Sequence, residues 1–338
     1  MTLEALWFFI WGLLWAVYFI TDGFDLGAGA LLPFLARDES QKRMMYNATG
    51  PLWDGNEVWL ITAGGVTFAA FPKAYAVMFS AFYTAFFLLL MALIIRGISF
   101  EFRSKADSVT HKKFCDTCHF VGSALVAILL GVAFANIFRG LPIENGVNQA
   151  GLFALLNPYG LCGGILFLLL FLTHGAIWLA IRTEGDLHDR AVKTAKILWP
   201  ILLVVAVIFL VYTWFETGLF KNYVAHPVLF IVPAIAVAAL LANRLFVGQQ
   251  HYWKAWFASA VTIAATTFFA IIGLFPVMLP STIDPEKNSI TYTMAASTPH
   301  TLTVMLIVVA CLLPFVIGYQ LWAYSLFSRK LNSGELIY

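Results

Sequence analysis

Charged side chains are what this sequence has least of. Asp, Glu, Lys and Arg make up 11% of its 338 residues, whereas soluble domains carry about 25%. No Lys or Arg precedes Arg37, so the chain lacks the positive leader of a cleavable signal peptide, and its first apolar segment is expected to be retained. A basic tail, a low-complexity segment and a nucleic-acid-binding motif are also absent, which argues against nucleic acid as a partner.

Apolar residues dominate the rest of the chain. Hydrophobic residues make up 61% of it, and the mean hydropathy of +0.84 indicates an all-α polytopic membrane protein. A membrane span needs about 20 apolar residues. Nine segments are long enough, at residues 6–35, 50–71, 74–102, 114–138, 152–181, 192–216, 226–247, 253–280 and 301–327. The sequence therefore predicts nine transmembrane helices.

Basic residues are distributed unevenly among the loops between these segments. Most of them, Arg96 included, are assigned to the loops after the first, third, fifth and seventh segments or to the C-terminal tail. The other side holds Lys73, Arg139, Lys221 and Lys287. Because Lys and Arg gather in cytoplasmic loops, the N-terminus is predicted outside and the C-terminus in the cytoplasm.

A polar stretch divides the predicted helices into two groups. We expect residues 1–140 to form a first four-helix bundle and residues 141–300 a second one. The second bundle includes a polar loop at 281–300 that faces outward. Residues 301–338 supply one peripheral helix and the cytoplasmic end of the chain.

Two acidic turns interrupt the apolar segments. Asp22 and Asp25 lie in the first segment, and Trp53, Asp54 and Glu57 open the second. A charge in hydrocarbon costs at least ~2.5 kcal/mol, so acidic residues there indicate a functional site. The loop between these two segments is short, and both turns are therefore expected to face each other near the cytoplasmic side. A carboxyl group that exchanges its proton there could act as a proton relay.

Asp54 and Glu57 also have a purely structural interpretation. They lie near a helix N-terminus, where the helix dipole stabilises carboxylates. Lys42 and Arg43 are available as ion-pair partners. This interpretation is compatible with a relay role.

Asp22 and Asp25 have an alternative of the same kind. Hydrogen bonds from Asn56, Thr21 or Thr62 would make them contacts between helices rather than relay groups. Two carboxylates one helical turn apart are not both expected to be ionised when buried. The nearby glycines permit close approach of another helix; they are Gly23, Gly27 and Gly29.

Seven motifs resemble subunit II of the cytochrome bd-type quinol oxidases. They are DGFDLG (22–27), WDGNEVWLITAGG (53–65), FRSK (102–105), LLNPYGL (155–161), RTEGDLHDRA (182–191), LPST (279–282) and WAY (322–324). The resemblance runs nearly end to end. It implies a heterodimer of subunits I and II in the bacterial plasma (inner) membrane. That complex is an electrogenic oxidase, which oxidises quinol and reduces oxygen to water with protons from the cytoplasm.

The resemblance also implies how the work is divided between subunits. Two haems b, one haem d and the quinol-oxidation loop belong to subunit I, so this chain is expected to hold no haem, metal or catalytic residue. Trp53 and Asp54 match a Trp-Asp pair connected in the family with a proton path. The sequence leaves open a structurally bound quinone or lipid and small accessory subunits.

Two features suggest haem but have simpler explanations. Residues 115–119 read CDTCH, a match to the haem c attachment pattern. They lie at a predicted cytoplasmic helix start, whereas haem c is attached on the outer face. Zinc or redox use of Cys115 and Cys118 is a further alternative. His174 could ligate haem iron, although a hydrogen-bonded packing role is expected.

A secondary transporter is the alternative class for an apolar chain of this kind. Secondary transporters are built from repeats with interrupted helices around a site at the middle of the membrane. The polar residues of this chain are instead gathered toward one side, and no paired interrupted segments are evident. The sequence therefore favours the oxidase subunit.

Overall fold

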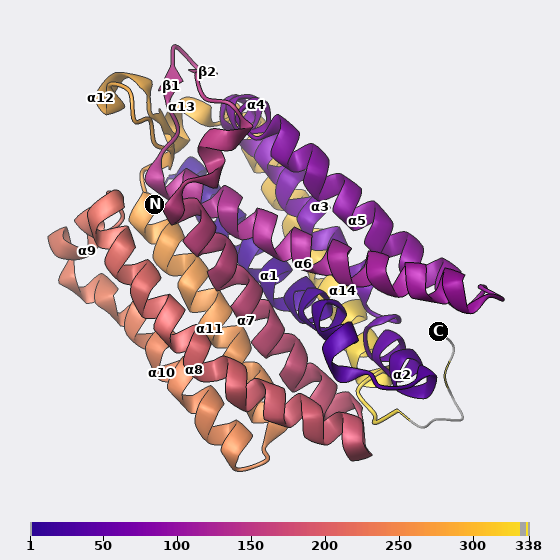
Figure 1. Ribbon diagram of the computed structural model, residues 1–338. Coiled ribbons are helices and arrows are strands. Elements are labelled where there is room, and N and C mark those ends of the chain that lie inside the picture. The colour runs from indigo at the N-terminus through magenta and orange to yellow at the C-terminus, as the bar shows by residue number, and fades with distance from the viewer. Residues whose placement is uncertain (1, 332–335, 337–338) are drawn as a thin grey trace.

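The computed structural model describes residues 2–331 and residue 336, and this part of the chain is almost entirely helical (Figure 1). Its longer helices are α1 (Leu3–Leu35), α2 (Glu39–Thr49), α3 (Trp53–Ala70), α4 (Pro72–Ala81), α5 (Tyr83–Arg103), α6 (Val109–Arg139), α7 (Pro158–Arg182), α8 (Gly185–Glu216), α10 (Ile231–Gly248), α11 (Tyr252–Leu274) and α14 (Pro299–Leu326). Short helices are α9 (Phe220–Ala225), α12 (Pro285–Asn288), α13 (Tyr292–Ala295), η1 (Leu152–Leu156) and η2 (Pro227–Phe230). The strands are β1 (Ile143–Glu144), β2 (Val147–Asn148), β3 (Val277–Leu279) and β4 (Ile290–Thr291).

Eight helical segments among the described residues are long and apolar enough to cross a membrane. They are α1, α5, α6, α7, α8, Pro227–Gly248, α11 and α14. Each coincides with one of the segments predicted from sequence. The prediction at residues 50–71 corresponds to α3, which has 18 residues. The polar residues of its first turns keep α3 from qualifying as a span by composition.

The structure differs from the predicted segments at two places near α3. The loop expected before it contains α2, whose N-cap Asp38 accepts a hydrogen bond from the backbone N–H of Gln41 at 2.9 Å. After it, the segment predicted at 74–102 is divided at Phe82 into α4 and α5. Pro72 opens α4, because its fixed φ suits a first helical turn and its missing N–H is not needed there.

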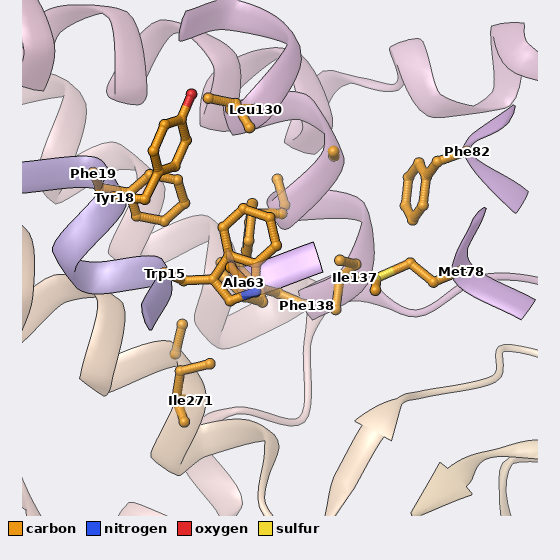
Figure 2. Packing of buried hydrophobic residues seen from close by; sticks show 14 of the residues in the cluster. Trp15, Tyr18, Phe19, Ala63, Met78, Phe82, Leu130, Ile137, Phe138 and Ile271 are labelled. Atoms are coloured by element: carbon orange, nitrogen blue, oxygen red, sulfur yellow. The ribbon is translucent and has the colours of Figure 1, made fainter. Parts of the chain in front are cut away.

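α1 is the central helix and packs against α3, α6, α7 and α11. A Cβ on Gly27 would lie 1.7 Å from the carbonyl oxygen of Phe171 on α7, and one on Gly175 would lie 2.4 Å from the backbone nitrogen of Ala28. The two backbones are therefore in direct contact, as the small residues of α1 predicted. Figure 2 shows the neighbouring core, where Trp15 and Phe19 of α1 pack among residues of other helices.

The two ends of the molecule are built differently. At one end, here called the hairpin end, β1 pairs with β2 and β3 pairs with β4, and an isolated bridge joins Leu141 to Ser281. The loop predicted at 281–300 lies here and contains α12, β4 and α13. The opposite end, here called the α2 end, is formed by α2 and by residues after α14 (Figure 1).

Contacts at the α2 end join segments that are far apart in the sequence. Lys42 pairs with Asp116 at 2.8 Å, and the Arg190 guanidinium donates to the carbonyl of Leu35 at 2.9 Å. The backbone N–H of Leu331 donates to the carbonyl of Arg182. Basic loops that the charge pattern assigned to one side of the membrane therefore meet at one end of the structure.

Candidate functional site

Arg96 of α5 is the centre of a polar site inside the helical bundle near the α2 end. Its side chain is fully buried. One amino group, Nη2, lies 2.8 Å from Oδ1 of Asp22, and the other, Nη1, lies 3.2 Å from Oε2 of Glu57. The guanidinium therefore joins α1, α3 and α5. We call Asp22, Asp25, Glu57, Arg96 and Asn56 the acidic cluster.

Helical periodicity explains how these residues meet. Asp22 and Asp25 are one turn apart on α1, and both are fully buried. Asn56, also fully buried, comes from the first turns of α3. Its side-chain N–H donates to Oδ2 of Asp25 at 2.6 Å. Two of the predicted site residues are thus held by partners on two other helices.

Aromatic rings cover the guanidinium of Arg96. Its central carbon lies 5.9 Å from the ring centroid of Trp53 and 5.8 Å from that of Phe100. The two rings are themselves stacked, with centroids 5.1 Å apart and an interplanar angle of 2°. Arg side chains are attracted to aromatic faces at this range. Trp53 and Phe100 thus lie beside the buried cation.

α14 reaches the acidic cluster through two polar side chains. Oδ1 of Asn56 accepts hydrogen bonds from the Tyr324 hydroxyl at 2.7 Å and from the Gln320 amide at 3.2 Å. Oε1 of Gln320 in turn accepts from the Trp59 indole N–H at 2.9 Å. These contacts belong to a helix that is otherwise little buried.

Carboxyl groups outnumber the cations in this site. In the described part of the chain, Arg96 is the cation of the acidic cluster, and it faces the three carboxyl groups of Asp22, Asp25 and Glu57. Buried atoms without a hydrogen-bond partner among the described residues include Oδ2 of Asp22, Oδ1 of Asp25 and Nε of Arg96. Leaving a buried polar atom unpaired costs about 1–3 kcal/mol.

Asp54 occupies a different position from the other predicted acids. Its side chain is exposed, on the side of α3 opposite the buried Asn56. The prediction that Asp54 faces Asp22 and Asp25 is therefore wrong, because its side chain points away from these buried acids. Glu57 lies between the buried cluster and the exposed surface of α3. Its side chain is 20% exposed, and one of its carboxyl oxygens pairs with Arg96.

Some partners proposed from sequence are different in the structure. Glu57 pairs with Arg96 rather than with Lys42, which instead binds Asp116. The hydroxyl of Thr21 donates to the carbonyl of Val17 within its own helix, and that of Thr62 donates to Val58. Asn56 is the predicted hydrogen-bond partner that the structure confirms.

Arg96 is the central residue of the candidate site, and it was not among the site residues predicted from the sequence. It was assigned to a loop because basic residues cluster after the third segment, but it lies inside α5. An arginine within an apolar run is expensive unless it has counter-ions. The acidic residues of the first two predicted segments could serve as these counter-ions. An arginine in one apolar segment and acids in two others therefore indicate a buried ion pair. Gln320 and Tyr324 gave no such signal, because neutral polar residues near a helix end are common.

A second ion-pair network lies between the acidic cluster and the surface of the α2 end. Nε of Arg103 donates to Oδ1 of Asp116 at 2.5 Å, and its amino groups donate to the Glu39 carboxylate at 3.1 and 3.0 Å. The guanidinium also lies 5.0 Å from the Tyr46 ring. Burial raises the pKa of Tyr46, which keeps its phenol neutral. This network fastens α2 to α5 and α6.

The two buried histidines make packing contacts and hydrogen bonds inside the bundle. Nε2 of His174 bonds to the carbonyl of Ile20 at 3.1 Å, and its ring stacks on Trp256 with centroids 5.0 Å apart. Nδ1 of His119 bonds to Ser99, and its ring packs on Tyr46. Two apolar cavities between the described helices have no histidine in their walls. His174 has the packing role that the sequence favoured.

The CDTCH motif lies in the first turns of α6 and packs against α2. Cys115 is buried, and its carbonyl accepts a hydrogen bond from the Tyr46 hydroxyl at 3.4 Å. Neither Cys115 nor Cys118 forms a disulfide. Among the described residues, no group of three or more His, Cys, Asp and Glu side chains could hold a metal ion. This placement favours ordinary helix residues over an attachment site.

The fold and the buried cluster define a multi-pass helical membrane protein that buries acidic side chains toward one end. The family model for cytochrome bd terminal oxidase subunit II matches residues 3–327. The chain belongs to this family.

Relatives agree with this assignment over nearly the whole chain. A probable cytochrome oxidase subunit 2 of Haemophilus influenzae is 36% identical over 96% of this chain and 95% of its own length. Cytochrome bd ubiquinol oxidase subunit 2 of Bacillus subtilis is 35% identical over 99% of this chain and 98% of its own. The structure of bd oxidase from Geobacillus thermodenitrificans superposes with a TM-score of 0.77 at 17% identity, covering 96% of this chain and 99% of that one, and supports the fold.

Proposed function

We propose that this chain is the haem-free second subunit of a quinol:oxygen oxidoreductase in the bacterial plasma membrane. Its partner, subunit I, carries two haems b and one haem d, oxidises quinol and reduces oxygen to water. The family match over residues 3–327 carries this proposal.

The membrane arrangement follows from the helices and the charge pattern. α3 is the ninth span. It begins after α2 at one end of the molecule and leads into α4 and the apolar α5 at the other. The basic α2 end faces the cytoplasm, and the hairpin end faces outward. Residues 1–140 and 141–300 form two four-helix bundles, with α14 as the peripheral helix. Membrane lipids cover α8 and α10, whose apolar side chains are largely exposed.

Subunit I docks on the face formed by α3 and α5. Exposed apolar side chains on this face include Ile61 at 71% and Tyr83 at 74%. Open space lies in front of Gly55, Gly64 and Gly65, and small residues of this kind permit close helix packing in membranes. The exposed carboxyl of Asp54 lies on α3 as well. A protein partner can hydrogen-bond this carboxyl, whereas lipid tails cannot.

The acidic cluster supplies protons from the cytoplasm to the haem-bearing subunit. One guanidinium faces three carboxyl groups, so at least one of these groups is expected to hold a proton that it can pass on. Glu57 connects the buried acids to the α3 face, where Asp54 would hand protons to subunit I. Trp53 covers Arg96 and keeps the route separate from lipid. Small accessory subunits are not required by this arrangement.

A structural quinone or lipid fits a cavity of about 800 Å³ bordered by α1, α3, α4, α5 and α6. Its wall is mostly apolar and aromatic, and it includes Trp15. The indole N–H of Trp15 is buried without a partner in the described part of the chain. A quinone carbonyl would accept a hydrogen bond from this N–H.

The test of the proposed function is turnover of the purified two-subunit complex. Quinol-driven oxygen uptake, normalised to haem content, should be lost when this chain is removed. A reduced-minus-oxidised spectrum of each separated subunit should assign the haems to subunit I. Haem in this chain, or full turnover by subunit I alone, would contradict the proposal.

A further inference from the structure

The hydrogen bonds between α14 and Asp25 have a defined direction. Trp59 donates to Gln320, Gln320 donates to Asn56, and Asn56 donates to Asp25. Tyr324 also donates to Asn56. The four contacts are between 2.6 and 3.2 Å long. This chain of donors, which we call the α14 relay, ends on one of the buried carboxyl groups of the acidic cluster.

The direction is fixed at its origin by the indole group of Trp59. An indole N–H can donate a hydrogen bond but cannot accept one. Trp59 therefore requires the carbonyl end of the Gln320 amide, which turns the NH₂ end toward Asn56. Asn56 must then present its carbonyl to Gln320 and its own NH₂ to Asp25. Rotating either amide by half a turn would bring two donors or two acceptors together.

We propose that Trp59 and Gln320 are positioning residues that hold Asn56 with its NH₂ group toward Asp25. An NH₂ group in this position hydrogen-bonds the ionised carboxylate, whereas a carbonyl group would accept the proton of the acid form. The relay therefore favours release of a proton from Asp25. This inference deepens the proposed proton-transfer role of the acidic cluster and rests on it.

Charged and titratable groups from four helices share the surroundings of Asp25. Asp22 on α1 and Glu57 on α3 repel its negative charge, and Arg96 on α5 attracts it. Tyr324 on α14 lies close enough to interact as well. The nearest histidines on α6 and α7 bond elsewhere; they are His119 and His174. A neutral substitution in the relay changes none of these charges, so it isolates the effect of amide orientation.

The experiment uses the two-subunit complex with the double substitution Gln320→Met and Tyr324→Phe. Both donors to Asn56 are then lost, and its amide can turn its carbonyl toward Asp25. Infrared difference spectra recorded across pH report the carbonyl stretch of a protonated carboxyl group, which Asp25→Asn assigns. The midpoint of this band should move to higher pH by about one unit, a tenfold change in proton affinity. The pH profile of oxygen uptake should move in the same direction.

Tyr319→Phe is the matched control. Tyr319 lies on the same helix and is 68% exposed, outside the relay. Its substitution should leave the midpoint unchanged. An unchanged midpoint in the double variant would overturn the inference, and so would an equal shift in the control. Trp59→Phe provides a second, neutral variant if the double variant does not assemble. It removes the indole N–H that fixes the orientation of the Gln320 amide. An unchanged midpoint here would also overturn the inference.

The two proposals fail in different ways. If Asp25→Asn leaves oxygen uptake unchanged, Asp25 is not in the proton path and the proposed function loses this residue. The infrared midpoint still reports whether the relay sets the proton affinity of Asp25. If Asp25→Asn slows uptake but no relay variant moves the midpoint, the positioning role alone is overturned.

Discussion

Arg96 shows how a single residue can hold several membrane helices together. Its guanidinium binds Asp22 and Glu57 and is covered by Trp53 and Phe100. A buried ion pair gives little net stability, because desolvation opposes the attraction between the charges. Removing one partner has a large effect, since the remaining charge is left buried and uncompensated. Arg96 is therefore needed for stability as long as Asp22 and Glu57 are present.

Arg96→Gln should destabilise the complex by about 3–5 kcal/mol. The substitution leaves the Asp22 carboxyl without its cation in a fully buried position. Thermal unfolding of the purified complex, followed through subunit dissociation, measures the effect. Arg96→Gln combined with Asp22→Asn should recover part of the loss, because two neutral amides can hydrogen-bond. A double variant less stable than Arg96→Gln would contradict this explanation.

Asp54→Asn should slow oxygen uptake while the complex keeps its haems. Asn has a similar shape but does not titrate, so it cannot pass a proton to the partner subunit. Asp54→Glu should retain more activity, because a carboxyl group remains. A helix-cap role predicts nearly normal behaviour, since Asn caps almost as well as Asp. Oxygen uptake per haem equal to that of the unmodified complex, at neutral and alkaline pH, would remove Asp54 from the path.

At the scale of elements, the contact between α1 and α7 has the least tolerance for change. Gly27 lies against the backbone of Phe171, so an added methyl group must push the two helices apart. Gly27→Ala should lower the stability of the complex by about 1–3 kcal/mol, the usual cost of overpacking, or more. Gly318→Ala on α14 is the control, because open space lies in front of that glycine. Equal thermal midpoints for both variants would refute the close-contact explanation.

The two cysteines in the first turns of α6 are expected to have no role in haem binding or oxygen uptake. Cys115→Ser combined with Cys118→Ser should leave the haem spectrum and the oxygen uptake of the complex unchanged. Haem staining after denaturing electrophoresis should leave this chain blank. A stained band at the mass of this chain would show that the CDTCH motif attaches haem.

The sequence predicted the long elements well but not the details of the site. Runs of apolar residues located the eight spans, because burial in a membrane requires both length and hydrophobicity. Their ends were less accurate, since the segment predicted to start at residue 74 contains a break and α5 begins at Tyr83. α2 was missed because its polar residues carry no membrane signal, and it is specified by the cap at Asp38. Asp22 and Asp25 were recognised because charges are rare in such runs. Their link to Gln320 and Tyr324 depends on packing between distant segments, which periodicity does not encode.

At the scale of the whole molecule, α3 and α5 form an apolar face that the described residues leave uncovered. We expect loss of this chain to leave subunit I with disturbed haem content and without oxidase activity. Haem spectra and oxygen uptake of membranes that contain subunit I alone measure this outcome. Returning this chain with Ile61→Lys on the exposed face should fail to restore activity, whereas Ile201→Lys on α8 should reduce it less. Equal activity with both variants would place the docking face elsewhere.

The pairing of Asp22 with Arg96 also has a consequence for biosynthesis. The two residues are 74 positions apart in the chain, which at typical synthesis rates is on the order of 4–15 seconds of translation. During this interval α1 has left the ribosome but its cation does not yet exist. Two acids therefore enter the bilayer protonated, or wait beside the insertion machinery, until α5 is made. Arg96 is the last member of the acidic cluster to be synthesised, so the order of insertion decides when these acids first meet their cation.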